Sequence, residues 1–263
     1  MTLLALLFLA GCNKLKARDE LHKGVRAYKA GQLEAAIVHF QRAIDLDPDS
    51  ITARLYLATA YAVQFVPRNP SEENLRVART AISAFEKALE QDPDNTNALT
   101  YIASLYLGMG GALASEDWEE AKELYEKSKE FRRRLIRVAP KNPEHYYSIA
   151  VIDWAMAHRM NSQMRANLNQ QADEPLPARQ RRQLREQNEE LVEEGIEMIE
   201  AALKVNPSYV DAIAYLNLLY RQKADIVDTP EEREHYLQLA DDAFERQKRL
   251  RKELEAADAT PAN

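Results

Sequence analysis

Residues 40–50 read FQRAIDLDPDS, and nearly the same ending returns three more times along the chain. In each case an amphipathic run is followed by a proline, which ends a helix because it has no backbone N–H to donate. A helix terminator that recurs in the same surroundings predicts a stack of helical hairpins. The other endings are FEKALEQDPDN at 85–95, FRRRLIRVAPKN at 131–142 and IEAALKVNPSY at 199–209, and the four prolines are Pro48, Pro93, Pro140 and Pro207.

The composition agrees with a helical protein that buries a core. Of 263 residues, 46% are hydrophobic and 29% are charged, which is too polar for an integral membrane protein, and only 7 are glycine. A formal net charge of -7 argues against a nucleic-acid binder, which needs a basic face. The basic run RQRRQLR at 179–185 is followed directly by acidic EQNEELVEE, so we interpret it as a solvated helix face.

The only cysteine, Cys12, follows the apolar run LLALLFLAG at 3–11. Leu9-Ala10-Gly11-Cys12 resembles a bacterial lipobox, in which signal peptidase II cuts before a cysteine that carries a diacylglyceryl group. The resemblance implies a signal peptide at 1–11, a lipidated linker at 12–19, and a lipid-anchored protein on the periplasmic or extracytoplasmic side of the cell membrane or outer membrane.

The usual Lys/Arg-rich segment before such a run is missing from this N-terminus. Either the true start lies upstream of Met1 or the signal is short. The alternative is an ordinary cytosolic N-terminus with a buried cysteine.

The endings define a repeat of about 34 residues in which Pro48 is position 32. Gly24, Ala36, Phe40 and Ala43 then occupy positions 8, 20, 24 and 27. This pattern resembles the tetratricopeptide repeat (TPR), in which small residues let two antiparallel helices, A and B, approach closely. The large residue at position 24 fills the space toward the next hairpin.

The resemblance implies an all-α fold, a right-handed α-solenoid of about five TPR-like helical hairpins with long insertions between helices A and B. We expect the solenoid to cover 20–256 and to be followed by a disordered tail at 257–263. The predicted units are 17–50, 51–95, 96–142, 143–209 and 210–256.

The insertions have sequence signals of their own. Ser71 predicts a new helix start in the second unit, and Thr229 predicts a capping box with Glu232 in the fifth. In the third unit we expect a loop over GMGGALASED at 108–117, with GMGG as a turn. In the fourth, helix A should continue past Met160 and helix B should run from about 178 to 205. The insertion around 157–190 either pads the rim or forms a second surface.

We find no residue pattern typical of catalysis, so we expect no enzyme activity, no cofactor and no metal site. The five histidines do not have metal-ligand spacing. The resemblance to TPR proteins instead implies a concave groove lined by helix A, without the Lys/Asn/Arg clamp of the chaperone-binding members. The residues carried over to this groove are Tyr28, Leu55, Thr59, Thr100, Ser104, Tyr147, Val151, Trp154, Leu218 and Arg221.

The groove is mostly apolar and neutral, with Tyr147 and Trp154 as its natural anchors. This favours a non-enzymatic scaffold or adaptor that holds a segment of an envelope protein, for example to assist the assembly of an envelope complex. Three alternatives remain open. The protein could bind envelope polysaccharide or peptidoglycan, it could be a cytosolic TPR adaptor, or its groove could be filled by its own insertion or last helix.

Overall fold

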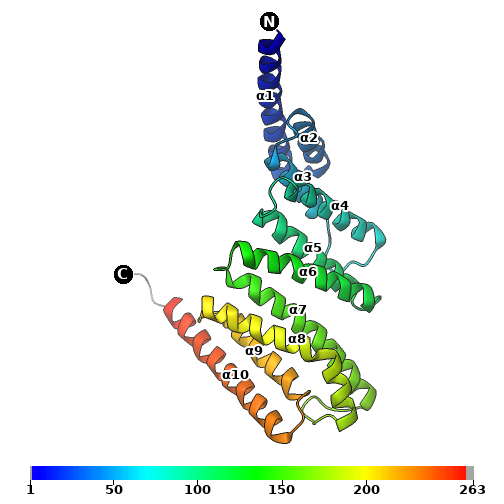
Figure 1. The fold of residues 1–263 in the computed structure, drawn as a ribbon, viewed down its shortest axis with the longest axis vertical. Helices are drawn as coiled ribbons and strands as arrows, with labels where there is room; N and C mark the ends of the chain where they lie inside the picture. Colours follow the sequence, from blue (N-terminus) through cyan, green and yellow to red (C-terminus); the bar gives the residue numbers. More distant parts are fainter. Residues whose placement is uncertain (1, 259–263) are drawn as a thin grey trace. The chain divides into compact units, whose positions relative to one another are not determined.

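The computed structural model describes residues 2–258, with side chains over 13–256, and this part of the chain consists of ten helices without a strand (Figure 1). The predicted all-helical fold is confirmed. None of these helices is long and apolar enough to cross a membrane. The helices are α1 (Thr2–Lys29), α2 (Leu33–Leu46), α3 (Ile51–Ala62), α4 (Glu72–Leu89), α5 (Thr96–Leu113), α6 (Trp118–Val138), α7 (Pro143–Leu168), α8 (Ala178–Val205), α9 (Val210–Ala224) and α10 (Pro230–Asp258).

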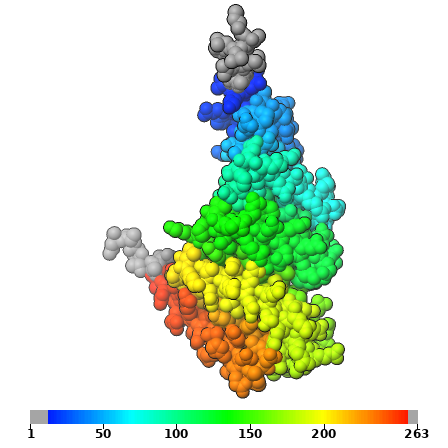
Figure 2. Space-filling view, in the orientation of Figure 1, coloured from blue at the N-terminus to red at the C-terminus, as the bar shows by residue number. Residues whose placement is uncertain are grey.

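Each odd-numbered helix packs against the even-numbered helix that follows it, which gives five hairpins. The chain divides into two compact units. Unit 1 (Met1–Val138) contains the first three hairpins, and unit 2 (Ala139–Asn263) contains the last two. Within a unit, successive hairpins join through α2 with α3, α4 with α5, and α8 with α9. On the face shown in Figure 2, side chains fill the spaces between the ribbons of each unit.

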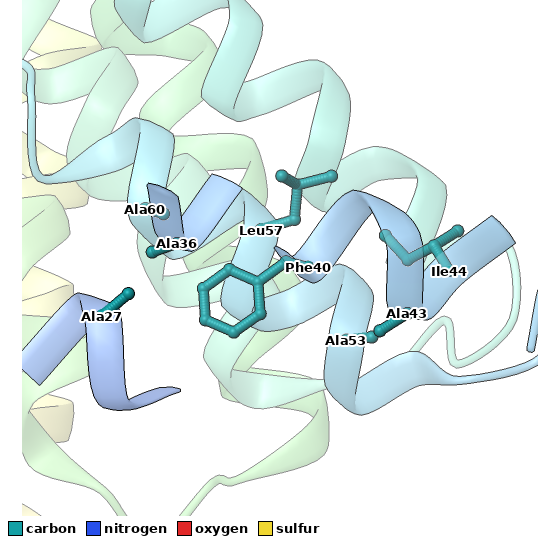
Figure 3. Close-up of a cluster of buried hydrophobic side chains, with 8 residues drawn as sticks. All are labelled: Ala27, Ala36, Phe40, Ala43, Ile44, Ala53, Leu57 and Ala60. Atoms are coloured by element: carbon teal, nitrogen blue, oxygen red, sulfur yellow. The ribbon is translucent and has the colours of Figure 1, made fainter. Parts of the chain in front are cut away.

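Small residues lie where the paired helices approach most closely, as the repeat pattern predicts. Ala36 is fully buried, and a Cβ added to Gly24 would lie 2.5 Å from the ring of Phe40. Phe40 is itself fully buried between Ala36 and the next hairpin, and its ring stacks on Tyr56 of α3 at 5.4 Å (Figure 3). Burying one such side chain contributes about 1.5–3 kcal/mol, so this contact holds successive hairpins together.

The helix ends follow local sequence signals. The four signature prolines each come within four residues after the last residue of α2, α4, α6 or α8. The Ser71 hydroxyl accepts a hydrogen bond from the Asn74 amide at 3.4 Å, which confirms the predicted start of α4. The Thr229 hydroxyl accepts from the Glu232 amide at 3.1 Å and the Glu232 carboxylate accepts from the Thr229 amide at 3.0 Å, so the predicted capping box is also confirmed.

The prediction of a turn at GMGG, residues 108–111, is wrong. These residues belong to α5, which continues to Leu113, and the connection to α6 is only 114–117. A Cβ at Gly110 would lie 2.8 Å from ring carbons of Tyr125, and one at Gly108 would lie 2.6 Å from Phe65. These glycines therefore allow close packing inside a helix and do not provide a change of chain direction.

Two boundaries near the termini also differ from expectation. Residues 12–19, predicted as a linker, are helical and part of α1, because Lys, Leu, Ala and Arg favour helix. At the other end α10 extends to Asp258, two residues into the predicted tail at 257–263. The rest of that tail and the side chain of the predicted lipidation residue Cys12 lie outside the described part of the chain.

The long insertion of unit 2 has the predicted form, since α7 reaches Leu168 and α8 begins at Ala178. Its loop is fixed from within by Arg165, whose guanidinium donates to the carbonyls of Gln171 and Glu174 at 2.7 and 2.9 Å. The same guanidinium lies 2.8 Å from the carboxylate of Asp225, beyond the end of α9. The insertion therefore packs against the α9–α10 connection of its own unit.

Candidate functional site

Four aromatic residues on α7 and at the start of α9 form a connected group in unit 2, which we call the aromatic face: Tyr147, Trp154, Tyr209 and Tyr215. The ring of Tyr215 meets Tyr147 and Trp154 edge-on, at centroid distances of 5.4 and 5.3 Å. Tyr147 also contacts Tyr209 at 5.0 Å. All four rings are half-buried. Tyr215 therefore joins the two predicted anchors, Tyr147 and Trp154, into one surface.

Helical spacing aligns the α7 part of this face. Tyr147, Val151, Trp154 and His158 follow one another at intervals of four, three and four residues, which places them on one side of a helix. The ring of His158 stacks on Trp154 at 4.9 Å with an angle of 10° between the planes. The start of α7 is fixed by Asn142, whose side chain accepts a hydrogen bond from the Glu144 amide.

Tyr215 can make this contact because the repeat has a different residue in the preceding helix. In unit 1 the tyrosine at the same helix position stacks on the preceding phenylalanine, as Tyr101 does on Phe85 at 4.9 Å. Ile199 replaces the phenylalanine before Tyr215 and is fully buried in the core beneath it, together with Ala150 and Ala212. An isoleucine offers no ring to stack on, and Tyr215 makes its ring contacts with α7 instead.

The edge of the aromatic face is acidic. Burial, followed by the neighbouring Tyr215, Asp211 and Glu144, raises the pKa of Tyr147. Burial and a hydrogen bond from its own hydroxyl to Glu144 raise the pKa of Tyr209. The Tyr209 hydroxyl donates to the carboxylate of Glu144, and Glu144 and Asp211 are exposed at the rim. The arrangement suits recognition of an apolar group flanked by positive charge.

The other predicted groove residues of unit 2 contribute unequally. Val151 and Leu218 are half-buried on the same A helices. Arg221 is exposed, but its guanidinium lies 2.7 Å from Asp241 on α10, so it is engaged within its own hairpin.

The predicted groove residues of unit 1 lie on α1, α3 and α5. Tyr28, Leu55 and Thr59 are half-buried, whereas Thr100 and Ser104 are exposed. The Thr59 hydroxyl donates to the Leu55 carbonyl at 2.8 Å. Burial and the nearby phenol of Tyr101 raise the pKa of Tyr28. This surface has fewer aromatic contacts than the aromatic face of unit 2.

Sequence reasoning missed Tyr209, Tyr215 and His158 as members of the site. The four-three-four spacing on α7 could have identified His158. The replacement of the usual phenylalanine by Ile199 indicates only that Tyr215 has no ring to stack on in the preceding helix. Among residues with described side chains, no group of three or more His, Cys, Asp or Glu is arranged to hold a metal ion.

Two parts of the chain match models of known families. Residues 24–64 match the family described as "TPR repeat". Residues 59–181 match the family described as "Plant specific mitochondrial import receptor subunit TOM20". A search of curated proteins finds no match.

Solved structures with a similar fold include several of MamA. One MamA crystal structure is 16% identical, covers 94% of this chain and 97% of its own, and has a TM-score of 0.51. MamA 41-end from Desulfovibrio magneticus RS-1 is 15% identical, covers 90% of this chain and 96% of its own, and also has a TM-score of 0.51. A MamA RS-1 double mutant is 15% identical, covers 92% and 97%, and has a TM-score of 0.52.

At these identities the similarity concerns the fold alone. The similarity shows an all-helical fold of the TPR-like solenoid class, and the family match shows a TPR repeat at residues 24–64.

Proposed function

We propose that this protein is a non-enzymatic scaffold that holds an apolar segment of a partner protein on the aromatic face of unit 2. The observation that carries the proposal is the group of four half-buried aromatic rings connected through Tyr215. Tyrosine and tryptophan are enriched among the residues that dominate binding energy at protein interfaces. The TPR-like fold suits this role, since stacked hairpins present extended surfaces for binding.

The chemistry of the face also defines the segment. Its centre accepts apolar side chains, and the exposed carboxylates of Glu144 and Asp211 at its edge favour flanking lysine or arginine. The partner segment should therefore combine apolar residues with basic neighbours. An acidic C-terminal tail would be repelled by the same carboxylates.

A selection from a random peptide library on the chain from Asn13 onward tests this proposal. The Trp118→Phe background leaves Trp154 as the sole tryptophan, so its fluorescence reports directly on the face. Selected peptides should be apolar with basic flanks. In fluorescence anisotropy with a dye-labelled selected peptide, Trp154→Ala should weaken binding by about 2 kcal/mol, roughly thirtyfold.

Phe244→Ala is the matched control, because this aromatic residue is 50% exposed on α10 of the same unit and lies outside the aromatic face. Equal binding by the wild type and Trp154→Ala would refute the protein-binding proposal. Trp154-dependent binding of soluble peptidoglycan or polysaccharide, without peptide binding, would favour the glycan alternative.

We further propose that Cys12 carries a diacylglyceryl anchor and holds the scaffold at the extracytoplasmic face of a bacterial membrane, where its partners are envelope proteins. The lipobox resemblance of Leu9-Ala10-Gly11-Cys12 supports this. Radioactive palmitate fed to expressing bacteria should label the wild type and leave Cys12→Ser unlabelled. Equal labelling, or no labelling of the wild type, would favour a cytosolic adaptor.

A further inference from the structure

Unit 1 contains a pocket of about 480 Å³ between α2 and α4, above α3. Four cationic side chains line it, Arg54 from α3 and Arg76, Arg79 and Lys87 from α4, and no acidic side chain is among its lining residues. A cluster of positively charged side chains without a negative one is unusual in a protein with a net charge of -7. The pocket lies outside the proposed groove and needs its own explanation.

The pocket and the predicted groove use different sides of α3. Arg54, Leu57 and Tyr61 line the pocket and follow one another at helical intervals of three and four. Leu55 and Thr59, which belong to the groove, are rotated from them by roughly 150° at about 100° per residue. A ligand in the pocket would therefore leave the groove side of α3 free.

Two of the four cations have free binding capacity. Arg76 and Arg79 pair with glutamates at the rim, in exposed ion pairs of the kind that contribute little. Arg54 donates from one terminal nitrogen to a backbone carbonyl, and its other terminal nitrogen makes no hydrogen bond within the described residues. Lys87 has no ion pair within the described residues. Arg54 and Lys87 can therefore bind an incoming anion.

The floor of the pocket is apolar. Ile44 and Leu57 are only 9% and 8% exposed and belong to the core cluster around Phe40. In Figure 3 Ile44 lies on the opposite side of Phe40 from Ala27, and Leu57 lies above the ring of Phe40. A small inorganic anion would leave this floor uncovered. A ligand that satisfies the whole pocket carries negative charge and an apolar group side by side.

We propose that this pocket binds an acidic, partly apolar peptide segment of a second partner protein. Its carboxylates pair with Arg54 and Lys87, and an adjacent apolar side chain covers Ile44 and Leu57. Guanidinium groups recognise carboxylates through paired, charge-assisted hydrogen bonds. The protein would then hold two segments of opposite charge at once, a basic one on the aromatic face and an acidic one in this pocket.

The proposal can be tested on the full chain in detergent with two dye-labelled peptides. One alternates glutamate with leucine, and the other, for comparison, alternates lysine with leucine. Fluorescence anisotropy should show binding of both peptides, but only the binding of the glutamate peptide should depend on Arg54 and Lys87, because the lysine–leucine peptide suits the aromatic face. Arg54→Gln and Lys87→Glu should each weaken it by at least about tenfold, in line with hydrogen bonds to charged groups. Lys252→Glu changes the net charge equally at an exposed site on α10 and should have no such effect.

Lys87 is exposed, so Lys87→Glu should keep the wild-type circular dichroism and remain informative if Arg54→Gln does not fold. Equal weakening by Lys87→Glu and Lys252→Glu, or no binding of the glutamate peptide, would overturn the proposal. Lys87-dependent binding of anionic phospholipid vesicles without peptide binding would overturn it in favour of a membrane ligand. Trp154→Ala should leave the glutamate peptide bound, so this proposal and the groove proposal can fail separately.

Discussion

Two neighbouring glycines near the end of α5 should respond in opposite directions to replacement by alanine. A Cβ at Gly110 would lie 2.8 Å from two ring carbons of Tyr125 and 3.1 Å from the backbone oxygen of Ala121. At Gly111 the nearest atom is the Tyr125 hydroxyl oxygen, at 4.0 Å. Since carbon atoms in ordinary contact are about 3.5–4.0 Å apart, only Gly110→Ala forces α5 and α6 apart.

The magnitude follows from two opposing effects. Alanine is favoured over glycine inside a helix by about 1 kcal/mol, and overpacking a well-packed site costs about 1–3 kcal/mol. One atom opposite Gly110 belongs to the backbone and cannot rotate away, so overpacking should exceed the helical gain. We expect Gly110→Ala to lower the free energy of unfolding by about 1–2 kcal/mol, and Gly111→Ala to raise it by up to about 1 kcal/mol.

Urea unfolding followed by far-ultraviolet circular dichroism measures both variants against the wild type. Hydrogen exchange of the amides at 105–113 then localises the change to α5. Equal stabilisation by the two substitutions would refute the close approach of α5 to α6.

Three further predictions concern side chains in both units. Arg165→Met breaks an ion pair whose side chains are only 8% and 11% exposed. It should lower the free energy of unfolding in urea by about 3–5 kcal/mol. Arg221→Met breaks an exposed ion pair and should lower it by less than about 1 kcal/mol. Hydrogen bonds from a lysine and a histidine lower the pKa of Glu20 from 4.5 to about 2. The stabilisation of the folded state by Glu20 is therefore complete above pH 4.5 and is lost as the pH falls toward 2. Glu20→Gln should remove this part of the acid dependence of unfolding. Phe40→Ala should cost about 3–5 kcal/mol in thermal unfolding, and Phe244→Ala, which removes a half-exposed ring, should stay within about 0.5 kcal/mol of the wild type.

Much of the fold could be predicted from the sequence because its signals are local. Pro48 and its three equivalents mark helix ends through the missing N–H, which does not depend on distant residues. The Thr229 and Glu232 capping box joins residues three positions apart. The small residues of the hairpins were also predictable, since the repeat brings the same positions together in each hairpin, as it does for Ala36.

The sequence also determined which residues of α7 could form a site. Tyr147 and Trp154 are seven residues apart, so any helix places them on one side. Whether they act together depended on Tyr215, which lies on another helix and meets both rings edge-on. Neither helical spacing nor repeat position specifies the orientation of a ring in the next hairpin.

Only the tertiary structure decided the features that depend on contacts between a residue and another helix. Gly110 looks like a turn residue until Tyr125, from the following helix, is placed against it. Likewise Arg54 and Lys87 are ordinary surface cations in the sequence, and they form one pocket only because α3 and α4 pack together. Local sequence determines where helices begin and end, because caps and prolines act over a few residues. The packing of one helix on another determines where close contacts and pockets form and which charged side chains share them. These contacts join residues far apart in the chain.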